Sequence, residues 1–245
     1  MTVTLQMLGT GSAFAKTYWN NNGILSNGKT HYLIDCGITA PMALHQMKRS
    51  FNEFEGVIVT HLHADHVGGL EEYGFQMKFK YGRKPRLIIA STLPELLWNH
   101  TLKGGMTQDG ISRLEDVFEV IRVEPDTDYD LMDQVYVRFI ETPHIVGKQS
   151  YSLLFNQLFF YSADMIFQPE LLQQLINQGV QAIWHDCQLI EPGEVHATIN
   201  QLLSLPIDIQ QIISLMHYGD NRDQYEGYTG PMSFINQHQV YTILD

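Results

Sequence analysis

The chain has 245 residues, of which 44% are hydrophobic and 17% charged, so it can bury a sizeable core and is not a disordered polypeptide. Its formal net charge of −12 disfavours a long nucleic acid as partner, because phosphate-rich polymers are usually bound by basic surface. Two cysteines, no long apolar run and no basic leader before an apolar stretch predict a cytoplasmic protein that neither spans nor binds a membrane.

β-Branched and aromatic residues between turn residues predict a strand-rich chain, with strand–helix alternation in the last third. Strands are predicted at residues 3–8, 30–34, 56–59, 86–90, 117–123, 135–141, 151–155, 158–161, 181–184, 211–215 and 240–243. Helices are predicted at residues 41–49, 71–79, 94–103, 169–177, 194–204 and 231–237. Thr39 is expected to cap the first helix, and Ser91 or Thr92 the third. We expect one α/β domain over residues 1–245, in which residues 104–116 form either a mobile lid or a plain surface connection.

The most informative segment follows the predicted strand 56–59. Four side chains of metal-ligand type stand within six positions there: His61, His63, Asp65 and His66. His61 and His63 alternate, so an extended backbone points both to one side, and the next two turn toward a second point. Imidazole and carboxylate suit zinc-class ions, and Gly68 and Gly69 allow the following helix to begin close to them. The segment therefore predicts a loop that offers two ligands to each of two metal ions.

The same His-x-His-x-Asp-His segment resembles the metal loop of the metallo-β-lactamase superfamily. The resemblance extends along most of the chain through residues 8–12, 33–37, 142–144, 161–164 and 215–218. The first of these is similar to the opening strand and glycine turn of the ribonuclease Z-like branch. The resemblance implies an α/β fold, the four-layer αββα sandwich, with the metal site at the edge where strands end. It also implies hydrolysis, because His63 stands where redox di-iron relatives typically carry Glu.

The resemblance further implies a complete ligand set for two zinc ions, with manganese as the alternative metal. The expected sets are His61, His63 and His144 for one ion, Asp65, His66 and His217 for the other, and Asp164 as the bridge. Independently of the resemblance, His144, Asp164 and His217 each end an apolar strand, where a site built from loops would lie. Asp35 is expected to orient a ligand histidine without binding metal.

Two further segments are expected to carry catalytic residues. His185-Asp186-Cys187 resembles the His-Glu-Ala-Thr segment of the ribonuclease Z family, and His196-Ala197-Thr198 resembles its His-Ser-Thr loop. In the family these positions bind the scissile phosphate and move protons, so Asp186 or His196 is expected to protonate the leaving oxygen. Asp65 is expected to help hold the attacking hydroxide and the ions. A structural carboxylate at Asp186 and a plain helix-start residue at His196 remain the alternatives.

The remaining histidines are expected to have structural surroundings. His31 and His45 are predicted at or near the surface, and His238 in a turn. His100 lies on a predicted amphipathic helix, where packing is favoured over a place in a substrate wall. Cys187 is expected to be a buried thiol and not a nucleophile.

The sequence favours a small phosphodiester substrate over tRNA. Only nineteen residues separate His144 from Asp164, whereas the tRNA-processing enzymes of this branch carry a long Gly/Pro-rich arm there. Residues 34–41, 69–75 and 97–102 resemble the anti-Pycsar phosphodiesterases. That resemblance implies a homodimer that opens cyclic nucleoside monophosphates, such as cyclic CMP and cyclic UMP, to linear monophosphates by a hydroxide that two metal ions activate. Such an enzyme counteracts cyclic-nucleotide antiphage signalling. If a phage encodes it, it acts in the cytoplasm of the host.

Three other function classes stay open. A tRNA 3′ endonuclease needs a basic face or an arm. The substrate of a lactone or thioester hydrolase contains no phosphate, whereas Asp186 and His196 favour a substrate with phosphate. A metal-binding module without activity is disfavoured by the complete ligand set. For the dimer, the apolar residues of the predicted helix 71–79, among them Phe75 and Phe79, exceed what one core contact needs, so we expect part of the subunit interface there.

Overall fold

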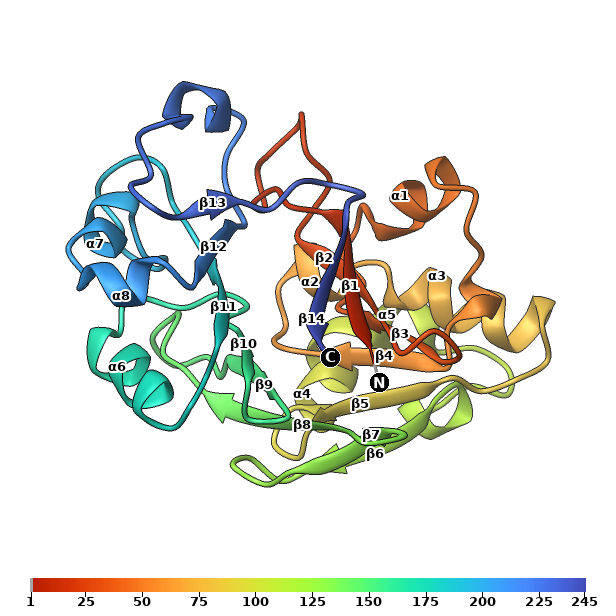
Figure 1. The fold of residues 1–245 in the computed structure, drawn as a ribbon. Helices are drawn as coiled ribbons and strands as arrows, with labels where there is room; N and C mark the ends of the chain where they lie inside the picture. The colour runs from red at the N-terminus through yellow and green to blue at the C-terminus, as the bar shows by residue number, and fades with distance from the viewer. Residues whose placement is uncertain (1) are drawn as a thin grey trace.

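The computed structural model describes residues 2–245 and arranges them around two seven-stranded sheets (Figure 1). The first sheet has the order β14-β1-β2-β3-β4-β5-β6. Its strands are β1 (Val3–Gly9), β2 (Asn22–Ser26), β3 (His31–Ile34), β4 (Gly56–Val59), β5 (Arg86–Ala90), β6 (Glu119–Val123) and β14 (Val240–Leu244). The second sheet has the order β13-β12-β11-β10-β9-β8-β7. Its strands are β7 (Tyr129–Met132), β8 (Val135–Glu141), β9 (Tyr151–Phe155), β10 (Phe159–Tyr161), β11 (Ala182–Asp186), β12 (Ile213–Met216) and β13 (Ser233–Phe234).

Helices cover the outer face of each sheet (Figure 1). Those packed with the first sheet are α1 (Ala40–Gln46), α2 (Ala64–Val67), α3 (Leu70–Phe75), α4 (Pro94–Leu97) and α5 (Lys103–Met106), and those on the second are α6 (Pro169–Asn177), α7 (Ile199–Leu203) and α8 (Ile207–Gln210). π-Helical turns at Gln76–Lys80 and Trp98–Leu102 continue α3 and α4, and 3-10 turns lie at Phe51–Glu53, Leu114–Asp116 and Arg222–Tyr225. The four-layer αββα arrangement predicted from the sequence is confirmed. Nowhere in residues 2–245 does a helix combine the length and apolar character of a membrane span.

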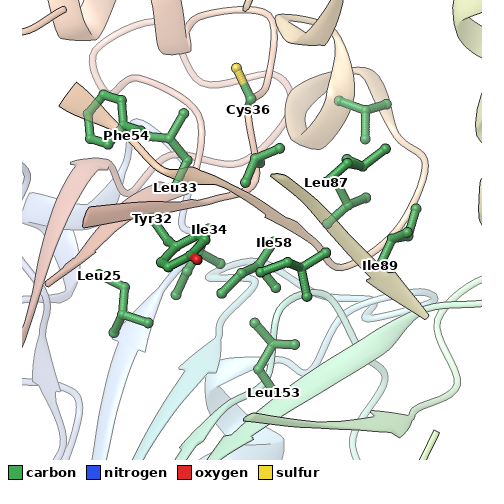
Figure 2. Packing of buried hydrophobic residues seen from close by; sticks show 14 of the residues in the cluster. Leu25, Tyr32, Leu33, Ile34, Cys36, Phe54, Ile58, Leu87, Ile89 and Leu153 are labelled. Atoms are coloured by element: carbon green, nitrogen blue, oxygen red, sulfur yellow. The ribbon is translucent and has the colours of Figure 1, made fainter. Parts of the chain in front are cut away.

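The main apolar core lies between the sheets and beneath the helices of the first one. In β3, Leu33 points to the helix side near Phe54, whereas Ile34 points toward Ile58 and toward Leu153 of the opposite sheet (Figure 2). All five side chains are fully buried. Strands that are covered on both faces read as uninterrupted apolar runs, and this is why residues 56–59 predict β4 with its observed bounds.

Parallel strands bring distant parts of the chain to one edge of the sandwich. β3, β4, β5 and β6 run parallel to one another, and so do β10, β11, β12 and β13. Because the carboxyl ends of parallel strands meet at the same edge, the loops that follow them lie together. The predicted metal-binding residues are on these loops or beside them.

Two predicted helices differ from the structure. Residues 231–237 contain β13 instead of a helix, and β13 extends the sheet through the pairs Ser214–Ser233 and Leu215–Phe234. The ring of Phe234 also packs edge-on against Tyr218, so tertiary contacts outweigh the helical pattern. The predicted helix 194–204 is shorter, because α7 begins after Thr198. His196 therefore lies in the loop before the helix and not at its start.

The structure also differs from the prediction in several short elements and in the helix N-caps. β2, β7, α2 and α8 are each at most five residues long and lie outside the predicted elements. Thr39 occupies the N-cap position of α1, but its hydroxyl donates to Asn20 Oδ1 and caps no helix amide. The N-cap of α4 is Leu93, one residue beyond the predicted caps. Residues 104–116 bury Ile111 and Leu114, which favours the surface connection over the lid.

Candidate metal centre

Seven polar side chains from four segments converge at the edge where the strands end. They are the seven predicted from the sequence: His61, His63, Asp65, His66, His144, Asp164 and His217. The first four follow β4, and the others follow β8, β10 and β12. All are buried except His63, which is half-buried. The topology of the two sheets, and not proximity in sequence, brings the four segments together.

One group of four donor atoms is built around three imidazole rings. His63 Nδ1 lies 3.0 Å from His61 Nε2 and 3.3 Å from His144 Nε2. Asp164 Oδ2 lies 3.7 Å from the His61 nitrogen and 3.9 Å from that of His144. All four donor atoms lie within 4.8 Å of one another, so they can surround a single ion.

A second group of donors uses the same oxygen of Asp164. Asp65 Oδ2 lies 3.3 Å from His66 Nε2 and 3.4 Å from His217 Nε2. Asp164 Oδ2 lies 3.4 Å and 3.3 Å from these two nitrogens. One carboxylate oxygen therefore faces both groups, as a bridge between two neighbouring ions requires.

Hydrogen bonds behind the centre fix which ring nitrogen faces it. His66 Nδ1 donates to Asp35 Oδ2 at 2.7 Å. Thr60 Oγ1 donates to the same oxygen at 2.8 Å and lies 3.1 Å from His61 Nδ1. Occupied Nδ1 atoms leave the Nε2 atoms of both rings directed to the centre. Asp35 belongs to neither donor group and holds His66, in agreement with the role predicted for it.

Strained backbone accompanies the site. Asp35, Ala163 and His217 have φ values of 59°, 50° and 57°, in the left-handed region that non-glycine residues rarely adopt. A Cβ on Gly37 would lie 1.8 Å from the carbonyl oxygen of Asp65, so the loop after β3 needs glycine to approach the metal loop.

The buried carboxylates of the centre favour bound cations. The carboxylates of Asp65 and Asp164 are buried, and within the described chain their basic partners are histidines alone. Burial opposes a charge on His66, yet Asp164, Asp65 and Asp35 raise its pKa well above the usual value. In residues 2–245, the buried atoms without a hydrogen-bond partner include His66 Nε2 and Asp164 Oδ1. Because such atoms are costly unless they bind something, the residues present fit two divalent ions that accept nitrogen and oxygen ligands.

Asp186 and His196 form a hydrogen-bonded pair next to the second donor group. Asp186 Oδ2 accepts from His196 Nδ1 at 2.8 Å and from Met165 N at 3.3 Å, and Oδ1 lies 3.0 Å from His185 Nδ1. Both oxygens of this buried carboxylate thus have partners, whereas Asp164 Oδ1 has none among the described residues. Burial opposes a charge on His196, but the hydrogen bond to Asp186 and the charge of Asp164 raise its pKa to about 9. The contact with Asp186 therefore favours the protonated form of the ring.

Two pockets open beside the centre, and His100 lines the larger one. That pocket has a volume of about 510 Å³ and adjoins His61, His63 and His144. His100 is exposed and lines it, whereas Trp98 and Leu102 are buried, so the packing role favoured for His100 over a substrate wall is wrong. The smaller pocket has a volume of about 380 Å³ and adjoins His196 and His217.

Sequence reasoning missed two groups that position the histidines. The carbonyl of Val195 accepts a hydrogen bond from His144 Nδ1 at 2.7 Å, and a main-chain carbonyl leaves no signal in a sequence. Thr60 directly precedes the metal loop, and its hydroxyl is a hydrogen-bonding group that the sequence could have indicated as a partner of a ligand histidine. The remaining predictions for His31, His45, His238 and Cys187 are confirmed: half-buried, exposed, turn and buried, respectively.

Comparisons with known proteins agree on fold and family. The family model described as anti-Pycsar protein Apyc1 matches residues 3–241. The anti-Pycsar protein Apyc1 of Paenibacillus harenae is 54% identical over 239 residues, which cover 98% of this chain and 99% of that protein. The anti-Pycsar protein Apyc1 of Bacillus phage BSP38 is 36% identical over 258 residues, with 99% of each chain covered.

A solved structure supports the fold at low sequence identity. The metallo-β-lactamase fold protein YhfI from Bacillus subtilis superposes with a TM-score of 0.74 at 14% identity, and the match covers 98% of this chain and 99% of that one. The fold is therefore the metallo-β-lactamase fold, as the sequence predicted. Together with the two groups of buried histidines and aspartates, it supports a metal-dependent hydrolase.

Proposed function

The chain belongs to the anti-Pycsar protein Apyc1 family, and we propose that it is a phosphodiesterase that uses two metal ions to hydrolyse cyclic nucleoside monophosphates to linear monophosphates. The observation that carries the proposal is the position of Asp164 Oδ2, which lies 3.3–3.9 Å from nitrogens of both donor groups. We place one ion on His61, His63 and His144, the other on Asp65, His66 and His217, and Asp164 between them. Such activity would counteract cyclic-nucleotide signalling in the cytoplasm.

Two divalent ions, when bound, lower the pKa of water and neutralise the oxygens of a phosphodiester. The chain's own contribution is to hold these ligands in place and to move a proton. We assign Asp65 to the orientation of the attacking water, because its carboxylate is the one donor of the second group that is neither shared nor an imidazole. The fixed Nδ1 contacts of His61 and His66 keep the centre from rearranging during the reaction.

The leaving oxygen needs a proton, and we assign its delivery to the Asp186–His196 pair. Water adds its oxygen to phosphorus and releases one proton to solvent, and one phosphorus–oxygen bond of the ring breaks. The ribose oxygen takes up a proton from His196, which solvent then replaces. His196 uses Nδ1 for Asp186, which leaves Nε2 as the nitrogen that can donate. Asp186 holds the ring and stabilises its protonated form.

The structure around the site favours a small substrate over tRNA. Residues 145–163 form a short loop, β9, a tight turn, all of β10 and the two residues after it, which leaves no length for an arm that grips a polynucleotide. The net charge of −12 also disfavours long contacts with phosphate backbones. A cyclic nucleotide brings one negative charge, which the metal ions can neutralise.

A substrate panel tests the proposed function. Zinc-loaded and manganese-loaded protein should convert cyclic CMP, UMP, AMP and GMP to linear monophosphates, measured by chromatography, and should leave a tRNA precursor intact. Trimming of the precursor without any opening of the cyclic nucleotides contradicts the proposal and favours the tRNA endonuclease. Hydrolysis of a lactone or thioester alone, assayed on the same preparation, favours the lactone or thioester hydrolase.

We expect about two zinc-class ions per chain, because the ligands divide into three for each ion plus a bridge. Elemental analysis of protein dialysed after zinc supplementation checks this number. His45→Ala, at an exposed position of α1, serves as the control and should keep both ions. Protein that retains no metal after supplementation contradicts the ligand assignment.

We further propose that the protein is a two-fold dimer. Tyr73 and Met77 are buried in the core, but Phe79 is 60% exposed and its ring packs on Phe75 at a centroid distance of 5.7 Å. This leaves an aromatic pair at the surface where we expect a second copy. Light scattering at micromolar concentration should give the mass of a dimer, and Phe79→Glu should shift it toward the monomer. A wild-type monomer contradicts the proposal.

A further inference from the structure

A pocket on the His196 side of the centre has the dimensions of a nucleoside site. Its volume of about 380 Å³ lies within the range of small-molecule sites, roughly 300–1,000 Å³. Its lining combines apolar and polar residues at one edge of the centre. The apolar side chains are Ala13, Phe14, Leu189, Ile190 and Val195, and the polar ones are Ser12, Gln188, Asn221, His196 and His217. The larger pocket adjoins His61, His63 and His144 and does not reach His196.

We propose that this smaller pocket holds the ribose and base of the substrate, and that Phe14 is the residue on which the base stacks. The inference rests on the proposed function. In a cyclic nucleotide both ester oxygens belong to the ribose, so the oxygen that leaves phosphorus stays on the nucleoside. If His196 protonates that oxygen, ribose must lie within hydrogen-bond reach of the His196 ring. Of the two pockets beside the centre, the one that contains His196 meets this condition.

Phe14 is presented to the pocket by a loop that the fold holds in place. The loop is closed by Gly11 N, which donates to Trp19 O at 2.8 Å. The carboxylate of Asp220 accepts from Lys16 N at 2.9 Å and from Thr17 N at 2.8 Å. Despite these anchors the ring of Phe14 is 89% exposed. A large aromatic side chain that a fixed loop leaves in water beside a reaction centre is available for stacking.

Stacking on Phe14 also accounts for tolerance of different bases. Every base has a π-face, so an aromatic platform binds purines and pyrimidines alike. Two carboxamides line the pocket, those of Gln188 and Asn221, and Gln188 already donates from Nε2 to the carbonyls of Ile190 and Pro192, at 2.7 Å and 2.6 Å. The Gln188 amide is therefore not free to read the edge of a base. We expect the pocket to select for the presence of a base more than for its identity.

Steady-state kinetics with Phe14→Ala tests the inference. The KM for cyclic CMP, UMP, AMP and GMP should rise roughly 10–100-fold, with kcat changed little, because one stacking contact is lost. Phe14→Tyr should behave like wild type, since it keeps the ring. Ribose 3′,5′-cyclic phosphate without a base should be hydrolysed equally well by wild type and Phe14→Ala. Calorimetry with a non-hydrolysable cyclic phosphorothioate should show the same loss in Kd.

Two control variants separate stacking from general effects. Tyr228→Ala removes another exposed aromatic ring, and Leu96→Ala trims the wall of the larger pocket. Both should leave KM near the wild-type value. If wild type is active but Phe14→Ala matches it, or if Leu96→Ala raises KM instead, the nucleoside does not bind at Phe14 and the inference is overturned. If metal-loaded wild type opens no cyclic nucleotide, the proposed function fails, and this inference fails with it.

Discussion

Replacing His61 and His63 together by alanine should abolish hydrolysis, a fall of more than about 10³-fold, because the first donor group loses two of its four members. His144 and Asp164 alone offer too few donors for a tightly bound ion. The second group keeps Asp65, His66, His217 and Asp164, so the metal content should fall from about two ions to about one. Elemental analysis and the rate of cyclic nucleotide opening are measured on the same preparation.

The fold should survive this double substitution. Both histidines lie on the loop after β4 and contribute no apolar surface to the core between the sheets. A circular dichroism spectrum and thermal unfolding curve check this point, with His45→Ala as the matched control at an exposed histidine. Should the double variant not fold, His63→Ala alone provides the test, since the half-buried ring of His63 is the less enclosed of the two. Wild-type activity in a folded variant contradicts the metal assignment.

The ligand positions were predictable because buried parallel strands have a clear sequence signature. An uninterrupted apolar run such as residues 57–59 marks a strand covered on both faces, and the first polar residues after it mark the edge of the sheet. His61, Asp164 and His217 follow such runs directly or within a few residues. Which loops meet at that edge depends on strand order, and for that the resemblance to a known family was needed.

The parts of the site that the sequence did not predict depend on contacts between distant residues. Nothing in residues 12–18 indicates that the carboxylate of Asp220 holds this loop beside the centre. The hydrogen bond from His144 Nδ1 to the carbonyl of Val195 could not be predicted either, because it also joins residues far apart in the sequence. His100 has the spacing of a packed helix residue, but the turn at 98–102 buries Trp98 and Leu102 and leaves His100 exposed. β13 pairs with β12 through two residues only, too few for a strand pattern.

The pair formed by Asp186 and His196 has a competing interpretation. Asp164, Asp186, His196 and His217 also place donor atoms within 4.8 Å of one another, so these four residues are themselves a candidate metal group. The hydrogen bonds argue against Asp186 as a ligand, because both of its oxygens already have partners, one of which is His196 Nδ1. A ligand role predicts loss of metal when Asp186 is replaced, whereas a proton-transfer role predicts normal metal content.

Asp186→Ala and His196→Ala should therefore each lower the turnover of cyclic nucleotides by roughly 10²–10⁴, while metal content stays near two ions per chain. A substrate that needs no protonation of its leaving group distinguishes proton transfer from a structural defect. Bis-p-nitrophenyl phosphate releases a stable phenolate, so its hydrolysis should fall far less in both variants than ring opening does. Asp186→Asn should have an intermediate effect, because the amide still holds the His196 ring but no longer stabilises its charge. Equal losses on both substrates, or loss of one ion, would show that the pair positions or binds metal and does not donate the proton.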